Sequence, residues 1–400
     1  MRLLFVHERF GAMAGAEVNA FLTATELKTR GHTLGIIHGE GTGKNEAGWH
    51  ESFSSCFPLA NQAGSDAVRR AIEQFRPDVI YVHKMADLDV IEALVKCGLP
   101  LVRMVHDHDI YCMRSYKYNP LTRNICTRPA SPYCIIPCGA TVTRNRNGSL
   151  PVKWVSYLDK RKEIRLNRRF ERMVVATNYM KEELVRNSFD ERQIEVHAPV
   201  PRTIESSLRG SFSARNLILY SGQIIRGKGV DVLLQCLAGL QLAFECIIFG
   251  EGSHRPFCER LCAELGLTGR VHFKGFVPQE ELKSYYADGS LTVMSSVWPE
   301  PFGAAGLEGM RYGLPIVAFD AGGIKEWLLD GCNGFLVPWM DRAQFTARMS
   351  QLLQDKILAR QMGERGRQLV HDKYSFAQYI QNLEVMFMQV ISEAKAKTSK

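Results

Sequence analysis

Short apolar segments alternate with longer amphipathic segments along most of this chain of 400 residues. The first half contains RLLFVH, TLGIIHG, DVIYVH, PLVRMVH and MVVATN, and the second half contains LILYSG, AFECIIFG, VHFKGF, LTVMSS and LPIVAF. Strands that alternate with helices predict parallel sheets, because each parallel connection has to cross the sheet through a covering helix. The pattern therefore predicts an α/β fold with two doubly wound domains in tandem.

The boundary between the two predicted domains falls near residue 200. Pro199 and Pro201 precede a polar stretch, TIESSLRGSFSARN, that separates the two series of strands. A chain of this length is also long for one core, and two domains of roughly 200 residues are the usual outcome. We expect domains over residues 1–200 and 201–374, followed by a helix over 375–400 that packs back on the N-terminal domain.

The sequence shows no apolar run near the roughly 20 residues that cross a bilayer. Its short apolar start meets Glu8 and Arg9 before it could form a signal-peptide core. The chain has 11 cysteines, which without a secretion signal indicate a reducing compartment. We therefore expect a cytoplasmic protein.

Much of the net charge of +8 gathers in DKRKEIRLNRRFERM, residues 159–173, which we interpret as a basic helix. One interpretation is an ordinary solvated face. The other is attraction to anionic lipid at the inner face of the cell membrane, or to a phosphate-bearing acceptor. We expect no nucleic-acid partner, because the run lacks interleaved aromatic residues and no nucleic-acid motif accompanies it.

Glycines and cations follow the first predicted strand of each half. The turn RFGAMAGAE contains Gly15, and the turn SGQIIRGKG contains Gly222, Arg226 and Lys228 directly before a helix. Backbone amides at a helix start, together with Lys and Arg, can hold a diphosphate. A surface loop with incidental positive charge is the alternative interpretation.

Two glutamates flank a run of small residues in SVWPEPFGAAGLEGMRYGLPIVAFDAGG, residues 296–323. Glu300 and Glu308 stand on either side of the point where a predicted strand gives way to a helix. Ordinary helix-start residues would explain Pro301 and Gly303. An anion site at the helix start would explain the same pattern.

The order and spacing of these segments resemble a family 4 glycosyltransferase, a retaining, nucleotide-sugar-dependent enzyme of the GT-B fold. The resemblance covers nearly the whole chain and is strongest over residues 217–338, through GxxxRGKGVDVLL, FGEGSHRPFCERLCAELGL, VHFKGFVPQEEL and the E-x7-E motif before GLPIVAFDAGG. The N-terminal half adds the AGAE turn and the histidine that ends VRMVH. The resemblance implies two Rossmann-like domains that face a central cleft.

The resemblance also implies a role for each candidate residue. Glu308 would bind the ribose hydroxyls, Glu300 would orient the donor sugar, and Lys228 would neutralise the leaving diphosphate. His106 would contact the donor sugar. The implied catalytic residues are Glu300, His106 and Lys228, and the implied donor-binding residues are Gly15, Gly222, Gln223, Arg226, Lys228, Phe276, Val277, Phe302, Gly303, Ala304 and Glu308.

One position departs from the family pattern. The family usually has arginine directly after the glycine that ends the first strand of the second domain, whereas this chain has Gln223. A neutral amide can donate a hydrogen bond to phosphate but cannot offset its charge. Arg226, three positions further on, is the candidate replacement.

The implied reaction needs no catalytic metal, because Lys, Arg and backbone amides stabilise the leaving diphosphate. We expect a UDP-sugar in preference to a GDP-sugar, and a glycan or lipid-linked acceptor in cell-envelope polysaccharide synthesis. The alternatives are a catalytically silent nucleotide-sugar-binding module of the same fold, or another enzyme of this fold such as an epimerase or a phosphorylase.

A group of cysteines in residues 107–140 lies outside the family pattern. Four thiols on a long loop in a reducing compartment suit a structural zinc, but the spacing C-x13-C-x7-C-x3-C contains no CxxC pair. Unligated cysteines or an iron–sulfur cluster are the alternatives, and His108 or Asp109 could replace one ligand. We expect zinc, with the ligands Cys112, Cys126, Cys134 and Cys138.

Overall fold

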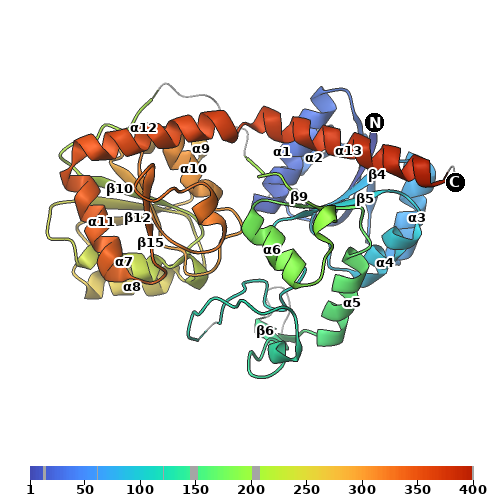
Figure 1. Cartoon of the computed structure of the whole chain (residues 1–400), viewed down its shortest axis with the longest axis horizontal. Helices are drawn as coiled ribbons and strands as arrows, with labels where there is room; N and C mark the ends of the chain where they lie inside the picture. The colour runs from blue at the N-terminus through green and yellow to red at the C-terminus, as the bar shows by residue number, and fades with distance from the viewer. Residues whose placement is uncertain (12–14, 61, 120, 145–151, 201–207, 399–400) are drawn as a thin grey trace. The chain divides into compact units, whose positions relative to one another are not determined.

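The computed structural model describes the whole chain except residues 12–14, 61, 120, 145–151, 201–207 and 399–400. The chain forms two compact units (Figure 1). The N-terminal unit comprises Met1–Lys117, Thr127–Arg202 and Phe376–Lys400, and the C-terminal unit comprises Tyr118–Cys126 and Thr203–Ser375. Each unit is built around its own parallel sheet.

The sheet of the N-terminal unit consists of β1 (Arg2–Phe10), β2 (Thr33–Gly41), β3 (Ser55–Pro58), β4 (Val79–Val82), β5 (Leu101–Val105), β8 (Arg172–Val175) and β9 (Ile194–Val196). Its order is β3-β2-β1-β4-β5-β8-β9, and each neighbouring pair is parallel. The strand order reverses between β1 and β4. Ligands of doubly wound sheets bind at the carboxyl ends of strands beside such a reversal.

Helices cover both faces of this sheet, and the alternation of side chains along β1 shows why the strand is apolar throughout. Leu4 and Val6 belong to one buried cluster, whereas Leu3 and Phe5 belong to a second cluster on the other face. The helices of the unit are α1 (Gly15–Thr29), α2 (Glu46–Ser52), α3 (Gly64–Phe75), α4 (Leu88–Lys96), α5 (Tyr157–Asn167), α6 (Asn178–Arg186) and α13 (Phe376–Thr398).

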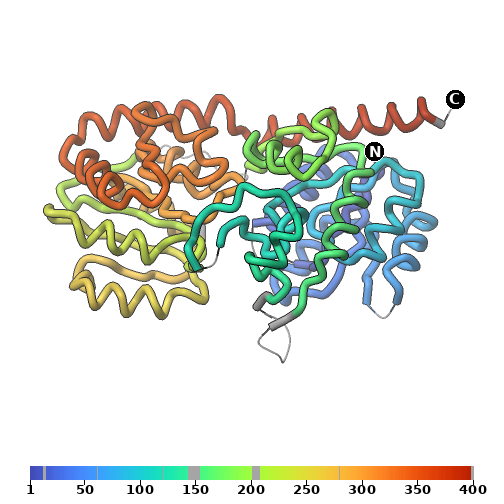
Figure 2. Tube along the Cα trace, turned by 60° about the horizontal axis from the view of Figure 1, so that its bottom comes forward, coloured from blue at the N-terminus to red at the C-terminus, as the bar shows by residue number. Residues whose placement is uncertain are grey.

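The last helix, α13, completes the second of these clusters. Its buried residues recur at helical spacing and pack with strand residues such as Tyr81; they are Tyr379, Ile380, Leu383, Met386, Phe387 and Val390. The Phe387 and Tyr81 rings meet edge to face with their centroids 5.1 Å apart. Figure 2 shows α13 as the red helix that ends at the C-terminus. The predicted helix over 375–400 therefore corresponds to an element of the N-terminal unit.

The C-terminal unit has a sheet of β10 (Leu217–Ser221), β11 (Glu245–Phe249), β12 (Val271–Gly275), β13 (Leu291–Met294), β14 (Ile316–Phe319) and β15 (Gly334–Val337). Its order is β12-β11-β10-β13-β14-β15, again parallel throughout, with the reversal between β10 and β13. The helices of the unit are α7 (Val230–Ala238), α8 (Arg255–Glu264), α9 (Gln279–Asp288), α10 (Ala304–Arg311), α11 (Arg342–Gln354) and α12 (Lys356–Lys373).

The predicted fold class is confirmed by the two parallel, helix-covered sheets. The predicted N-terminal domain, however, included residues 118–126, and the structure places Tyr118–Cys126 in the C-terminal unit. These residues contact α7 and the loop before it through side chains distant in sequence, which local periodicity cannot reveal. The remaining long connection contains a short antiparallel pair, β6 (Val142–Arg144) with β7 (Val152–Trp154).

We expect the packing of α13 to dominate the stability of the N-terminal unit. Phe387 is fully buried, so Phe387→Ala should lower the free energy of unfolding by about 3–5 kcal/mol. The neighbouring Met388 has 53% of its surface exposed, so Met388→Ala should change it by about 0.5 kcal/mol or less. Urea unfolding followed by tryptophan fluorescence measures both. Equal losses in the two variants would contradict the packing of α13 against this sheet.

Candidate functional site

The loops that follow β10 and β13 are hydrogen-bonded to each other where the strand order of the C-terminal sheet reverses. The backbone amides of Val297 and Trp298 donate to the carbonyl oxygen of Gly227 at 2.9 and 3.1 Å, and Ser295 Oγ donates to the Lys228 carbonyl at 3.0 Å. Gly229 has a φ of 66°, and a Cβ there would lie 2.0 Å from the Ser295 carbonyl oxygen. Only glycine fits this approach, which brings Lys228 beside the loop after β13.

Lys228 and Glu300 form an ion pair at this point, with 2.6 Å between Nζ and Oε1. The Trp298 indole N–H donates to the same carboxylate at 2.9 Å, and the Ser296 hydroxyl also donates to it. Glu300 is 3% exposed. Burial alone would raise the pKa of Glu300, but the Lys228 charge and these donors outweigh it and hold that pKa below its ordinary value. The carboxylate is therefore charged and oriented at neutral pH.

The start of α10 lies on the same loop. Its first residue, Ala304, follows Gly303, which has a φ of 84° and provides no side-chain cap. The Phe302 ring is buried beside Tyr374, and the Trp327 indole N–H donates to the Phe302 carbonyl at 2.6 Å. These contacts fix the backbone at the helix start, and Gly303 caps none of the first amides with a side chain. Such amides can receive an anion or a hydroxyl oxygen.

Glu308 lies on α10, one turn beyond Ala304 and on the same helical face. Burial raises the pKa of Glu308, and the nearby Arg311 opposes that shift. The Glu308 carboxylate therefore lies one turn from the helix-start amides, on the same face of α10.

The other predicted donor residues lie on neighbouring strand ends of the same sheet. Gly222 follows β10, and its amide donates to the Phe249 carbonyl at 3.1 Å. Gln223 and Arg226 are exposed on the connection to α7. Phe276, directly after β12, has 82% of its surface exposed, and Val277 packs against the core. The end of β12 is two strand spacings, about 10 Å, from that of β10, so a nucleoside could span the two.

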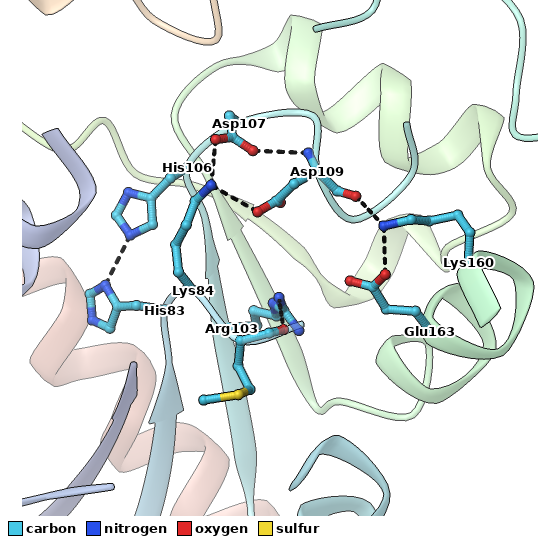
Figure 3. Close-up of polar contacts among 9 residues, drawn as sticks. His83, Lys84, Arg103, His106, Asp107, Asp109, Lys160 and Glu163 are labelled. Atoms are coloured by element: carbon cyan, nitrogen blue, oxygen red, sulfur yellow. Dashed lines mark hydrogen bonds and ion pairs between the residues drawn. The ribbon is translucent and has the colours of Figure 1, made fainter. Parts of the chain in front are cut away.

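His106 lies in the N-terminal unit, where it belongs to a polar cluster at the ends of β4 and β5 (Figure 3). His106 Nε2 and His83 Nδ1 are 2.9 Å apart, and the two rings stack. Burial, together with the nearby Lys84 charge, lowers the pKa of His106 to about 3. His106 is therefore a neutral hydrogen-bonding group.

Lys84 forms ion pairs with two carboxylates of the same cluster. Its Nζ lies 2.6 Å from Asp107 Oδ2 and 2.8 Å from Asp109 Oδ2. Burial and the neighbouring Asp109 charge raise the pKa of Asp107 to about 7, whereas Lys84 holds the pKa of Asp109 below its ordinary value. His83 and Lys84 are further members of this cluster that the sequence motifs did not reveal. Their position directly after the strand DVIYV is the sequence feature that could have identified them, because polar residues at such strand ends often belong to a site.

Gly15 begins α1 in the N-terminal unit, next to residues that the structure does not describe. The structure thus brings Lys228 and Glu300 into contact and places Gly222, Phe276, Gly303 and Glu308 at the same edge of one sheet. Trp298 and Ser296, which hold the Glu300 carboxylate, were not identified from the sequence, although both lie within the quoted motif. The roles of all these residues stay predictions.

The four cysteines of residues 107–140 are divided between the two units. Among the described residues, which include all four, no group of three or more His, Cys, Asp or Glu side chains is placed to hold a metal. Cys134 ends a 3-10 turn, Pro132–Cys134, and Cys112 packs beside the core of the N-terminal unit. Cys126 belongs to the C-terminal unit. Zinc on these four cysteines therefore stays a prediction, because spacing along a loop does not determine where its thiols lie.

The predicted basic helix over 159–173 is shorter than expected, since α5 ends at Asn167. Several of its cations are held by neighbouring acceptors: Lys160 by Glu163, Lys162 by Glu92, and Arg172 by Glu195 and Glu393. Arg161, Arg165 and Arg169 are exposed. In the part of the chain that the structure describes, no helix combines the length and the apolar character needed to span a bilayer.

Comparison with known proteins gives matches to two family models that together cover most of the chain. The model described as "Glycosyltransferase Family 4" matches residues 13–199, and that described as "Glycosyl transferases group 1" matches residues 203–369.

Curated relatives match over part of their length. An alpha-D-kanosaminyltransferase of Streptomyces kanamyceticus is 32% identical over 179 residues, which are 44% of this chain and 46% of that protein. A GDP-mannose-dependent alpha-(1-6)-phosphatidylinositol monomannoside mannosyltransferase of Mycolicibacterium smegmatis is 28% identical over 171 residues, 40% of this chain and 45% of that protein. The matched part of the chain thus spans less than half the length of these relatives.

Solved structures resemble the chain over nearly its whole length. Alr3699/HepE of Anabaena, determined in complex with UDP, has a TM-score of 0.73 at 18% identity and covers 97% of this chain and 100% of its own. Sucrose-phosphate synthase of Thermosynechococcus elongatus has a TM-score of 0.72 at 15% identity. The match covers 98% of this chain and 99% of the synthase chain. At these identities the likeness shows the fold alone, and the predicted GT-B fold is confirmed.

We expect the Lys228–Glu300 pair to stabilise the C-terminal unit. Lys228→Met should lower the free energy of unfolding by about 1–3 kcal/mol, because it leaves the buried Glu300 carboxylate without its counter-ion. The double variant Lys228→Met/Glu300→Gln should recover part of that loss, since no buried charge is left unpaired. Urea titrations of the four proteins in a double-mutant cycle measure the coupling. Additive effects would contradict the pairing.

The same pair predicts a specific dependence of stability on pH. Because the pKa of Glu300 lies below its ordinary value of 4.5 in the folded protein, the pair stabilises the fold above that pH. The contribution should be lost as the pH falls through the lower, folded-state pKa. Glu300→Gln should lack this part of the acid dependence, which unfolding at a series of pH values between about 3 and 7 would detect. If the free energy of unfolding of Glu300→Gln fell with pH as steeply as that of the unmodified chain, the lowered pKa of Glu300 would be contradicted.

Proposed function

Because the chain belongs to glycosyltransferase family 4, we propose that it transfers a sugar from a nucleotide-sugar donor to a glycan or lipid-linked acceptor, with retention of the anomeric configuration. The observation that carries the proposal is the oriented Lys228–Glu300 pair at the reversal of the C-terminal sheet. Helix-start amides and the Glu308 carboxylate lie at the same edge.

The proposed chemistry follows from the charges that develop in the reaction. Cleavage of the bond between the anomeric carbon and the diphosphate leaves an oxocarbenium-like centre and an anionic leaving group. Lys228, together with the amides at the starts of α7 and α10, can stabilise that anion as it forms. The acceptor oxygen would attack from the face that the diphosphate leaves, with a phosphate oxygen taking its proton. No step requires a metal ion.

Donor binding would rearrange the ion pair. Lys228 contacts Glu300, and the donor diphosphate would compete for the same ammonium group. Ser296 and Trp298 also donate to Glu300, so the carboxylate would keep its orientation and accept hydrogen bonds from the sugar hydroxyls. In the proposal His106, neutral at physiological pH, contacts the donor sugar as a hydrogen-bonding group.

We propose a UDP-sugar as donor, and the UDP complex of Alr3699/HepE supports this choice because that protein shares the fold. The Mycolicibacterium relative is named for GDP-mannose, so the base has to be tested directly. The proposed setting is cell-envelope polysaccharide synthesis at the cytoplasmic face of the membrane.

Incubation with radiolabelled UDP- and GDP-sugars, with and without a membrane lipid extract, tests the proposed function. Transfer of label to an acceptor in the extract is the expected result, and the product linkage reports retention. Conversion of the sugar without acceptor would indicate an epimerase, and nucleotide binding without turnover would indicate a binding module. Sugar release that needs inorganic phosphate and no nucleotide would indicate a phosphorylase.

We predict distinct effects for the two motif glutamates. Glu308→Ala should weaken donor binding by about 1–3 kcal/mol, because a pair of ribose hydroxyls loses a charged acceptor. Glu300→Ala should act mainly on kcat. Glu264→Gln, an exposed change at the end of α8, serves as the control. Calorimetry with UDP and steady-state kinetics separate the two effects, and wild-type values in both alanine variants would refute the site.

We also propose that the N-terminal unit docks on an anionic membrane surface through the segment 159–173. The exposed cations Arg161, Arg165 and Arg169 support this interpretation, because lipid phosphates attract such charges. Trp154 and Leu158, just before and within the first turn of α5, have 81% and 76% of their surfaces exposed. A tryptophan beside basic residues is typical of membrane interfaces.

Sedimentation with phosphatidylglycerol vesicles tests the docking proposal. Binding should fall steeply as the salt concentration rises, and reversing Arg161, Arg165 and Arg169 to glutamate should abolish it. The control with the same change in net charge reverses the exposed Arg69, Arg70 and Arg192 of the same unit. Equal losses in both triple variants would show that net charge alone matters, and equal binding to neutral vesicles would exclude the charge explanation.

A further inference from the structure

A small hairpin, residues Tyr118–Cys126, belongs to the C-terminal unit although the chain on both sides of it belongs to the N-terminal unit. Tyr118 and Ile125 form an antiparallel bridge. The Asn119 amide donates to the Asn124 carbonyl at 2.9 Å, and the Asn119 side chain accepts from the amides of Leu121 and Thr122. Arg123 follows with a φ of 63°. The turn thus presents Arg123 in a defined backbone conformation.

Arg123 forms an ion pair with Asp231, the second residue of α7, with 2.6 Å between Nη2 and Oδ2. Only 9% of Arg123 and 7% of Asp231 is exposed. The other oxygen, Asp231 Oδ1, has no hydrogen-bond partner among the described residues and lies 3.8 Å from His254 Nε2. Burial lowers the pKa of His254, so this ring is neutral at physiological pH. Arg123 is therefore the cation that offsets the Asp231 charge.

The hairpin also touches the loop that carries Lys228. A Cβ placed on Gly227 would lie 3.4 Å from Tyr118 Cε1 and 3.3 Å from Trp298 Cβ. Gly227 thus lies close to an aromatic ring of the hairpin and to one of the loop after β13. Its carbonyl already accepts two amides from that second loop. The hairpin and the loop after β13 together enclose the backbone directly before Lys228.

The position of Asp231 makes its charge relevant to the proposed donor site. It lies three residues after Lys228, at the start of the helix whose amides would face the diphosphate. A carboxylate without a counter-ion there would repel an anionic ligand, and it would also cancel part of the positive potential of the helix start. A paired carboxylate anchors the helix start and has neither effect.

We propose that Arg123 is a positioning residue for the donor diphosphate. It neutralises Asp231 and, with Tyr118, holds the segment Gly227–Gly229 so that Lys228 and the first amides of α7 face the phosphates. Arg123 itself contacts neither donor nor acceptor. This inference rests on the proposed function, because it requires a nucleoside diphosphate at this end of the sheet.

Binding of UDP and of uridine by the full chain tests the role, with GDP and guanosine measured in parallel. Arg123→Gln should raise the Kd for the diphosphate about tenfold, in the usual range of coupling between sites. The Kd for the nucleoside, which has no phosphate, should stay unchanged. The double variant Arg123→Gln/Asp231→Asn should recover most of the diphosphate affinity, because it removes the unpaired carboxylate.

Arg128→Gln is the matched control, since Arg128 is an exposed arginine of the same connection in the N-terminal unit. It should leave both dissociation constants unchanged. If Arg123→Gln does not fold, Arg123→Met, which also removes the charge, and the double variant provide the same comparison. Equal weakening of diphosphate and nucleoside, or no weakening, would overturn the positioning role alone. If the unmodified chain bound no nucleoside diphosphate, the proposed function and this inference would both fail.

Discussion

The parallel pairing of all strands in the two main sheets determines where polar side chains can form a binding site in this protein. Parallel strands are covered by helices on both faces, so alternate side chains of one strand enter two separate apolar clusters. Polar groups that have to reach a ligand are then placed at the strand ends. The two reversals of strand order, at β1/β4 and at β10/β13, separate neighbouring loops and leave space for side chains between them. Both polar clusters lie beside such a reversal.

The polar clusters of the two units differ in how their buried charges are compensated. In the C-terminal unit one ammonium group, that of Lys228, pairs with one carboxylate, and two further donors keep Glu300 ionised. In the N-terminal unit Lys84 is shared by Asp107 and Asp109. Because one cation cannot fully compensate two buried carboxylates, burial and mutual repulsion raise the pKa of Asp107 to about 7. The first arrangement suits a fixed hydrogen-bond acceptor, and the second places a group that changes its charge near neutral pH.

The connection between β5 and α5 shows how a long irregular segment can be ordered by interactions distant in sequence. In the N-terminal unit Lys117 pairs with the buried Glu183 at 2.9 Å, and one residue later the hairpin of the C-terminal unit begins. There Arg123 pairs with Asp231. Buried ion pairs add little net stability, but breaking one leaves an uncompensated charge, so they strongly disfavour other arrangements of the segment. Among the residues that the structure describes, the cysteines of the same connection belong to no group of three or more side chains placed to hold a metal.

The sequence by itself determined the succession of strands and helices, the two-sheet architecture and the segments that hold Lys228, Glu300 and Glu308. These properties depend on periodicity and on residues near one another in the chain, which a single sequence displays directly. Only the tertiary structure showed that Lys228 contacts Glu300, that Trp298 and Ser296 hold the carboxylate, and that Arg123 reaches Asp231 across 108 positions. Among the residues that it describes, it also showed no group of three or more His, Cys, Asp or Glu side chains placed to hold a metal. The physical reason is that a buried charge or a thiol finds its partners through the packing of distant segments, and spacing along the chain does not encode that packing.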